Sequence, residues 1–293
     1  MIVHEMSLRI GQAEAAAQRS LEHARLAEHR MLEARAIPSL GYAALNGPTP
    51  VPEAIDRCRT LLGEVRGNNK AEALLLTAIA HLEAMRGNFD EARDLYRRSR
   101  AILEELGWAF LAAQTSFDSG PIELLAGDPR AAEEELRRDY ETLDRMGEKN
   151  YISTTAALLA RAVYEQGRYV EAGTFADVSR ELAADDDVTS QVLWRGVHAM
   201  LLARAEEHAE AETMARSAVQ MSESADAPEA RGNALLDLAE VLSMAGDREG
   251  AARALAQSIG QFESKGMLVP AEAAQTRLAS LEGSVAEEPS VPS

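Results

Sequence analysis

A turn followed by an alanine returns about every 40 residues along this chain, and this period limits its possible folds more than any other feature. The turn is glycine-rich or polar, as in GNFDEA, GDPRAA, GRYVEA and GDREGA. The junction alanines fall at Ala54, Ala92, Ala132, Ala172, Ala211 and Ala251, in steps of 38, 40, 40, 39 and 40. Helices that were merely rich in alanine would not keep this phase. The period therefore predicts one supersecondary unit that repeats and stacks.

The clearest copy of the unit is residues 234–258, ALLDLAEVLSMAGDREGAARALAQS. Leu235, Leu238 and Leu242 recur at the spacing of one helix face, and a second apolar run follows the turn. The small residues Ala239 and Ala251 lie where two antiparallel helices would approach most closely. One such hairpin cannot bury its own apolar stripe. We therefore predict an all-α, right-handed solenoid of stacked helical hairpins.

The repeat pattern also sets the expected boundaries. Residues 1–10 show no clear period and are predicted to be irregular, and residues 11–282 are predicted to form the solenoid. A last helix over residues 270–281 is expected to cover the open end of the stack, and residues 283–293 are expected to be a disordered tail. The run from residue 11 resembles the second helix of a hairpin without its first. We therefore expect a fragment of a longer protein or a reassigned start.

Charge and composition limit the possible partners. The formal net charge is −18, which repels nucleic-acid phosphates and favours a basic peptide or protein surface, although solubility alone is a common reason for acidic surfaces. No uncharged apolar run is long enough to span a bilayer, and the N-terminus has no signal-peptide pattern. The single cysteine, Cys58, excludes an intrachain disulfide. We expect a cytoplasmic protein that binds neither membrane nor nucleic acid, with a homodimer as an open alternative.

These residues resemble the tetratricopeptide repeat, which places a small residue in the first helix, glycine at the turn and alanine in the second helix. The best-matching positions are Leu235, Leu238, Ala239, Leu242, Gly246, Ala251 and Leu255, followed by Ala160, Val163, Gly167 and Ala172. Glu206 and Thr49 stand where the turn glycine is usual, and the period is near 40 residues rather than the family's 34. Longer helices would account for the difference.

Longer phrases, among them ELLAGDPRAAEEELRRDYETLDRMGEKN and GNALLDLAEVLSMAGD, resemble the C-terminal repeats of bacterial nucleotide cyclases that carry an AAA-type ATPase, and of large ATPase regulators. In such proteins the catalytic domains lie upstream of the repeats. The resemblance therefore implies a regulatory or assembly role, with possible upstream catalytic domains in a longer chain. It implies no catalytic residue within residues 33–281.

The search for chemistry leads to the same expectation. The sequence has no phosphate-binding GxxxxGK[ST], no GxGxxG, no HExxH and no GxSxG. His23 and His29 are six residues apart, on different helix faces, and other histidines lie in different repeats. Cys58 lies between two arginines, which would lower its pKa if it were exposed, but a small buried residue is the simpler interpretation. We predict no enzyme activity, no metal and no cofactor.

The remaining candidate surface is the concave face, formed by the first helix of each hairpin. Partner-binding residues are predicted on the side of that helix opposite the packing leucines. They are Arg35, Tyr42, Thr77, His81, Gln114, Phe117, Thr154, Arg161, Tyr164, Asn233, Leu236 and Glu240. Trp194 and Arg195 are added because an indole beside a guanidinium could stack on a ligand, although a tryptophan also fills gaps between helices. Amides, guanidiniums and aromatic rings suit an extended peptide or a helix.

Three interpretations of this face stay open: a non-catalytic module that binds a peptide or protein segment, a small-ligand sensor arm of a signalling or transcription regulator, and a solvated surface. Pro38 and Pro121 lie within predicted first helices and should bend them. A bend at Pro121 would partly uncover Phe117, one turn earlier.

Overall fold

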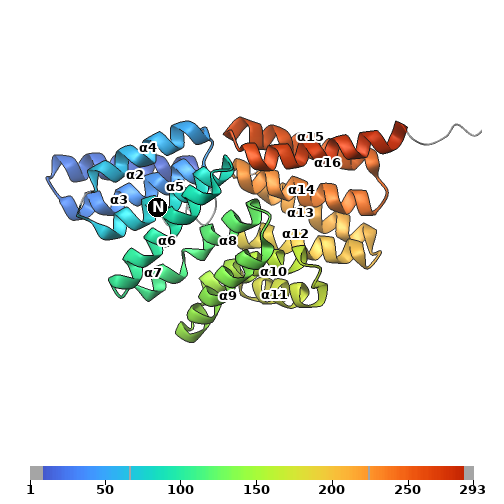
Figure 1. Cartoon of the computed structure of the whole chain (residues 1–293), viewed down its shortest axis with the longest axis horizontal. Helices are drawn as coiled ribbons and strands as arrows, with labels where there is room; N and C mark the ends of the chain where they lie inside the picture. The colour runs from blue at the N-terminus through green and yellow to red at the C-terminus, as the bar shows by residue number, and fades with distance from the viewer. Residues whose placement is uncertain (1–8, 66, 224, 287–293) are drawn as a thin grey trace, which may run out of the picture.

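The computed structural model describes residues 9–65, 67–223 and 225–286, which contain helices and no strand. The predicted all-α helical-repeat solenoid is confirmed (Figure 1). The undivided first helices of the hairpins are α3 (Arg30–Asn46), α5 (Asn69–Met85), α10 (Lys149–Glu165), α12 (Val188–Arg204) and α14 (Pro228–Met244). The second helices are α4 (Val51–Glu64), α6 (Phe89–Glu105), α9 (Pro129–Met146), α11 (Tyr169–Leu182), α13 (His208–Glu223) and α15 (Arg248–Lys265). Helix α2 (Ile10–Leu26) precedes this series and α16 (Leu268–Ala286) follows it.

The junction alanines lie in the second helices and are packed completely. All of them have 0% exposure: Ala54, Ala92, Ala132, Ala172, Ala211 and Ala251. A larger side chain at these positions would force the two helices of a hairpin apart. The regular spacing of these alanines in the sequence therefore marks the positions where the two helices of each hairpin pack most closely.

The turns between helices use left-handed backbone. Gly246, between α14 and α15, has a φ of 81°, which glycine adopts without steric cost. Glu206 takes the same place between α12 and α13, with a φ of 64°. Glu206 thus keeps the left-handed turn that glycine forms elsewhere, but its backbone is strained there because it has a side chain.

The first helix of the third hairpin is divided, although the sequence predicts one helix over residues 111–126. Helix α7 (Ala109–Ala113) and helix α8 (Ser116–Leu125) are separated by Gln114 and Thr115. The carbonyl of Ala112 accepts from the backbone nitrogen of Thr115 at 3.1 Å, from its hydroxyl at 2.7 Å and from Arg100 Nη1 at 3.2 Å. These contacts favour a tighter turn at this point. The break lies upstream of Pro121, which α8 contains.

The C-terminal end differs from the expectation in two ways. Helix α16 extends to Ala286, so residues 283–286 of the expected tail are helical, whereas residues 287–293 lie outside the described residues, as do 1–8 of the expected irregular N-terminus. The helix also does not cover an open end. Met267 and Ala271 belong to a buried apolar cluster that includes Val51 and Leu82 of the first repeats.

The two ends of the solenoid therefore contact each other, as Figure 1 shows where α15 and α16 reach α4 and α5. We call α2–α6 the N-terminal block, α8–α16 the C-terminal block, and their meeting at α3–α5 and α14–α16 the closure contact. Lys265, at the end of α15, donates to the carbonyl of Ala44 at 2.7 Å. Asp226 accepts from the backbone nitrogens of Ile10 and Gly11 at 2.5 and 2.6 Å. Neither contact was predicted from the sequence.

Cys58 lies in the same apolar cluster and is fully buried. Burial raises the pKa of its thiol to about 11, although Arg57 and Lys265 act in the opposite direction. The cysteine is therefore a small packing residue. In the part of the chain that the structure describes, no helix has the length and apolar character required to cross a membrane.

Candidate functional site

The residues predicted to line the concave face differ widely in exposure. Thr77, His81, Tyr164 and Trp194 are buried, so the prediction that they face an open groove is wrong. Arg35 is exposed. The others are partly buried: Tyr42, Gln114, Phe117, Thr154, Arg161, Arg195, Asn233, Leu236 and Glu240.

Thr77 and His81, on α5, bond to neighbouring helices. The Thr77 hydroxyl lies 2.8 Å from that of Ser99 on α6. His81 Nδ1 lies 2.9 Å from Asp118 on α8, and its Nε2 lies 3.3 Å from Glu229 on α14. Burial alone would lower the pKa of His81, but the two carboxylates raise it to about 10. The imidazolium therefore connects the two blocks.

Tyr42 and Leu236 also lie at the closure contact. Tyr42 packs against a small cluster that contains Ile10 and Ala227, from opposite ends of the chain. Leu236, on α14, packs against the apolar cores of both the C-terminal block and the closure contact. Together with His81, these residues contact the chain itself where a partner was expected.

The middle of the predicted row mainly joins adjacent repeats. Phe117 stacks on Tyr151 of the next repeat, with ring centroids 5.7 Å apart. The Thr154 hydroxyl lies 2.8 Å from that of Ser190 on α12. Phe117 therefore packs between two repeats, and its side chain stays partly exposed.

Arg161, Tyr164 and Glu240 are the predicted residues that the structure brings together. The Tyr164 hydroxyl donates to Glu240 at 2.8 Å and accepts from Arg204 Nε at 2.8 Å. Arg161 binds both carboxylate oxygens of Asp237 at 2.5 Å. This inner network links α10, α12 and α14, and Arg277 of α16 adds a contact of 3.4 Å to Glu240.

A glycine on the intervening helix makes room for the longest of these links. Arg161 and Asp237 are on α10 and α14, and Gly196 of α12 lies between them. A Cβ atom on Gly196 would come within 2.0 Å of Asp237 Oδ2. The ion pair thus crosses over α12 only because residue 196 has no side chain.

Trp194 and Arg195 pack against one another and against their own helix. The indole nitrogen donates to Gln191 at 3.1 Å, and the Arg195 guanidinium lies 4.2 Å from the ring centroid. The indole is 7% exposed. It therefore fills a gap between helices, the second of the two roles that the sequence left open.

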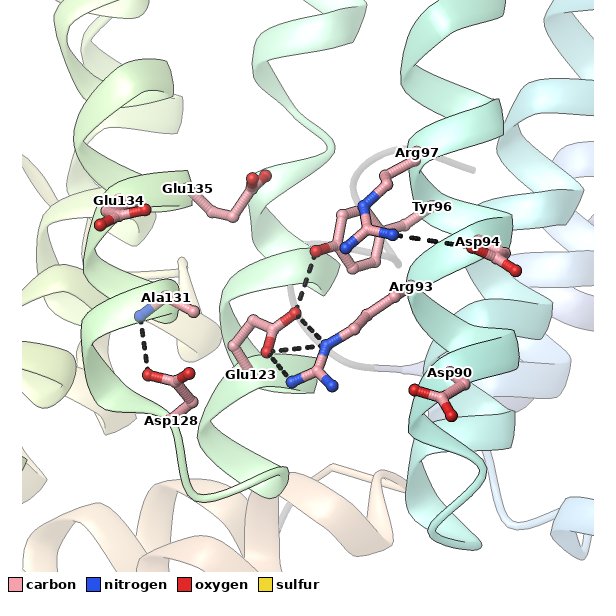
Figure 2. Close-up of a pocket in the computed structure, with 10 residues that line it drawn as sticks. All are labelled: Asp90, Arg93, Asp94, Tyr96, Arg97, Glu123, Asp128, Ala131, Glu134 and Glu135. Atoms are coloured by element: carbon pink, nitrogen blue, oxygen red, sulfur yellow. Dashed lines mark hydrogen bonds and ion pairs between the residues drawn. The ribbon is translucent and has the colours of Figure 1, made fainter.

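A groove of about 670 Å³ lies elsewhere, between α6, α8 and α9 (Figure 2). Four of its carboxylates are exposed: Asp90, Asp94, Asp128 and Glu134. The other residues that line it are Arg93, Tyr96, Arg97, Glu123, Ala131 and Glu135. Six carboxylates thus face two guanidiniums, and Arg138 from outside the lining pairs with Glu135, which leaves an excess of three negative charges (6 − 2 − 1).

The floor of the groove is one buried polar cluster. Arg93 donates to both carboxylate oxygens of Glu123, at 2.9 Å from Nε and 2.5 Å from Nη2. The Tyr96 hydroxyl donates to the same carboxylate at 2.9 Å, as Figure 2 shows. Burial, with the Glu123 charge, raises the pKa of Tyr96. Glu123 is therefore satisfied within the protein, and the exposed carboxylates are the ones that a ligand would reach.

The groove occurs where the two blocks join, at the divided helix. A second ion pair holds this junction further along α6, where Arg100 binds both oxygens of Asp139 at 2.9 and 2.8 Å. Asp139 has 0% exposure. We call this region the groove junction. The acidic run of residues 133–135 is visible in the sequence, but its place opposite Asp90 and Asp94 follows only from the packing of α9 near α6.

Within the described ranges, no cluster of three or more histidine, cysteine, aspartate or glutamate side chains is arranged to hold a metal ion. The groove carboxylates project from separate helices and do not converge on one point (Figure 2).

Comparison with protein-family models and with curated proteins gave no match. Solved structures do match. A signal transduction ATPase with numerous domains from Pyrococcus horikoshii, described as having a tetratricopeptide repeat sensor, gives a TM-score of 0.55 at 14% identity, over 95% of this chain and 44% of that one. This chain thus spans less than half of that protein. The chain has a tetratricopeptide-repeat-like fold.

Two further similar structures cover nearly the full length of both chains. A Rap protein complexed with Competence and Sporulation Factor gives a TM-score of 0.53 at 13% identity, over 97% of this chain and 96% of that one. The apo quorum sensor NprR from B. thuringiensis gives 0.53 at 11% identity, over 95% and 94%. At these identities the likeness concerns the fold.

Proposed function

We propose that this chain is a non-catalytic regulatory module that binds a basic peptide or protein segment in the groove between α6 and α9. The observation that carries the proposal is the groove lining, in which six carboxylates face two guanidiniums. Of those two, Arg93 is neutralised by Glu123, and Arg97 lies 3.6 Å from Asp94. Lysine or arginine side chains of a partner would add the missing positive charge.

Electrostatic recognition of this kind acts at long range and steers association, while shape sets the register. The net charge of −18 supports the same class of partner. The similar structures also support a regulatory role, because one is described as having a repeat sensor, one as a quorum sensor and one as a complex with a named factor. We expect the module to work in the cytoplasm.

Fluorescence anisotropy with a labelled peptide of alternating lysine and serine tests the proposal. We expect saturable binding that weakens as salt rises from 50 to 300 mM, because the Debye length falls below about 10 Å above 0.1 M. The double substitution Asp94→Lys with Glu134→Lys should reduce the affinity at least about tenfold.

The matched control is Glu181→Lys with Asp186→Lys, which makes the same change in net charge at exposed positions near the end of α11. Equal losses in both double variants would show non-specific attraction to an acidic protein. They would contradict a site in the groove.

The inner network is a second candidate surface, because the outer nitrogens of the Arg204 guanidinium make only a long contact to a carboxylate. Its guanidinium lies 4.2 Å from the centroid of the Tyr169 ring, and its Nη2 reaches Glu240 only at 4.0 Å. We propose that a partner carboxylate can bind there, beside Arg161 and Tyr164. Arg204→Gln should then weaken an acidic peptide and leave the lysine–serine peptide unchanged; an unchanged affinity for both peptides would remove this surface from consideration.

The fold also fits a regulatory part of a longer protein with an ATPase or cyclase module upstream, as the sequence resemblance implies. The likeness to a multidomain ATPase with a repeat sensor supports this arrangement. Co-purification of the chain with a separately expressed upstream ATPase module from the same reading frame would test it, and the absence of such a frame would leave a free-standing adaptor.

A further inference from the structure

The closure contact contains a site built for an ammonium group. Lys265 Nζ donates to the carbonyls of Ala44, Gly47 and Thr49 at 2.7, 2.6 and 2.7 Å. Three acceptors match the three protons of an ammonium. All three belong to the end of α3 and the loop after it, where helix carbonyls lack intrahelical partners and attract cations. Lys265 is 1% exposed, so the site is filled and closed.

An apolar surface surrounds this cage on the N-terminal block. Val51, Ile55 and Leu82 form one buried cluster with Phe262 and Met267, which lie on either side of Lys265 in the sequence. The end of α15 thus presents an aromatic ring, an ammonium and a thioether to a complementary surface. Only this end of α15 does so, because its earlier buried residues Ala251 and Leu255 pack in the core of the C-terminal block.

The opposite side of the molecule joins the same two blocks by different means. At the groove junction, α6 is held to α8 and α9 by Arg93 with Glu123 and by Arg100 with Asp139, around a solvent-filled groove. The first helix is divided there. The two blocks are therefore joined on one side by a divided junction, where ion pairs flank the buried Ile122, and on the other side by the docked end of α15.

We propose that the N-terminal block carries a binding site for a lysine-bearing amphipathic helix, that α15 occupies this site in cis, and that its release separates the blocks at the closure contact. The partner class is a helical protein segment with an aromatic residue three positions before a lysine, as in Phe262 and Lys265. This inference holds whether or not the groove binds a basic segment. Burial of the Lys265 ammonium costs free energy, which favours reversible release of α15. Burial lowers the pKa of Lys265 to about 8, although the nearby Glu229, Cys58 and Glu14 act in the opposite direction.

Lys265→Met in the full-length chain is the first test, with Lys149→Met as the control because Lys149 is exposed on α10. We expect the Lys265 variant to show a larger radius of gyration by small-angle X-ray scattering. The sole cysteine, Cys58, should react with Ellman's reagent at least about tenfold faster, because it shares the buried cluster with Phe262. Far-UV circular dichroism should be unchanged.

The second test measures the empty site directly. A fluorescent peptide of residues 248–267 should bind the Lys265→Met variant and bind the wild type at least about tenfold more weakly, because α15 competes in cis. The same peptide with methionine in place of its lysine should bind neither protein. A peptide that binds neither protein, or both equally, would overturn the proposed site.

If Lys265→Met loses helical circular dichroism signal because it fails to fold, the variant Asp226→Ala is measured in its place. Asp226 is exposed and holds the start of α2 from the C-terminal block, so its removal loosens the closure contact without opening a core. Asp186→Ala is its control. A radius of gyration and a Cys58 reaction rate equal to those of the wild type would overturn the reversible closure.

Discussion

The two junctions between the blocks both contain an apolar core, and they differ in the polar contacts around it. The closure contact buries apolar side chains around Lys265, which donates to backbone carbonyls, and His81 adds an ion pair with Glu229. The groove junction packs Ile122 of α8 against Ala80 and Ala84 of α5, and beside this apolar core Arg93 binds Glu123 in an open groove. Apolar burial gives stability without direction, whereas ion pairs fix orientation and contribute little net free energy. We therefore expect the apolar core of each junction to supply its stability, and the ion pairs of the groove junction to fix its orientation.

Removal of the aromatic anchor should have the largest effect. Phe262→Ala should lower the free energy of unfolding by about 3–5 kcal/mol, because it deletes a fully buried ring and leaves a cavity. Urea denaturation followed by circular dichroism measures this loss. A loss below about 1 kcal/mol would show that the apolar core does not supply the stability of the closure contact.

His81 contacts elements of both junctions, so its substitution should come next. His81→Gln removes an imidazolium held by Asp118 and Glu229 and should cost about 3 kcal/mol at pH 7. The folded-state pKa of about 10 lies above the ordinary 6.5, so the stabilisation is complete below pH 6.5 and disappears as the pH rises through 10. The difference in Tm between wild type and variant should therefore shrink between pH 7 and pH 10.5. A constant difference would mean that the histidine acts through packing alone.

A smaller effect is expected in the groove. Glu123→Gln keeps the shape but removes the charge that Arg93 binds, so it should cost about 2 kcal/mol. Glu134→Gln, at an exposed position of the same groove, should stay within about 0.5 kcal/mol of the wild type. Thermal unfolding of the pair measures the difference. Equal Tm values would show that the polar cluster contributes no net stability.

The smallest expected effect lies outside both junctions and has the opposite sign. Glu206→Gly should stabilise the chain by up to about 1 kcal/mol, because it relieves a left-handed backbone at a turn. Differential scanning calorimetry should show a small rise in Tm. A fall in Tm would mean that the glutamate side chain compensates for its strain.

The fold was predictable because its determinants are local. The phase of the junction alanines, from Ala54 to Ala251, reflects contacts between neighbouring helices, and these recur in every hairpin. Even the left-handed turn at Glu206 follows from its place in the repeat. The divided helix was missed because Arg100, on another helix, contributes to it.

The candidate sites were harder to predict because they depend on contacts that no period encodes. Lys265 and Ala44 are 221 residues apart in the sequence, and only the curvature of the whole stack brings them together. Because of that curvature, Tyr42, His81 and Leu236 contact the opposite end of the chain and not an open concave face. By contrast, Arg161 and Glu240 lie at equivalent positions two repeats apart, and Tyr164 follows Arg161 by one turn on α10, so the repeat itself places them near one another.

Gly196 has a consequence for how the chain unfolds. Stability in repeat proteins is usually a sum of units and nearest-neighbour interfaces, so that end repeats can fray alone. The ion pair between Arg161 and Asp237 passes over Gly196 and joins next-nearest neighbours. The three hairpins from α10 to α15 should therefore exchange their amide hydrogens as one cooperative unit. Unfolding of the first or third hairpin breaks this ion pair, and unfolding of the middle one removes the helix that spaces its two partners.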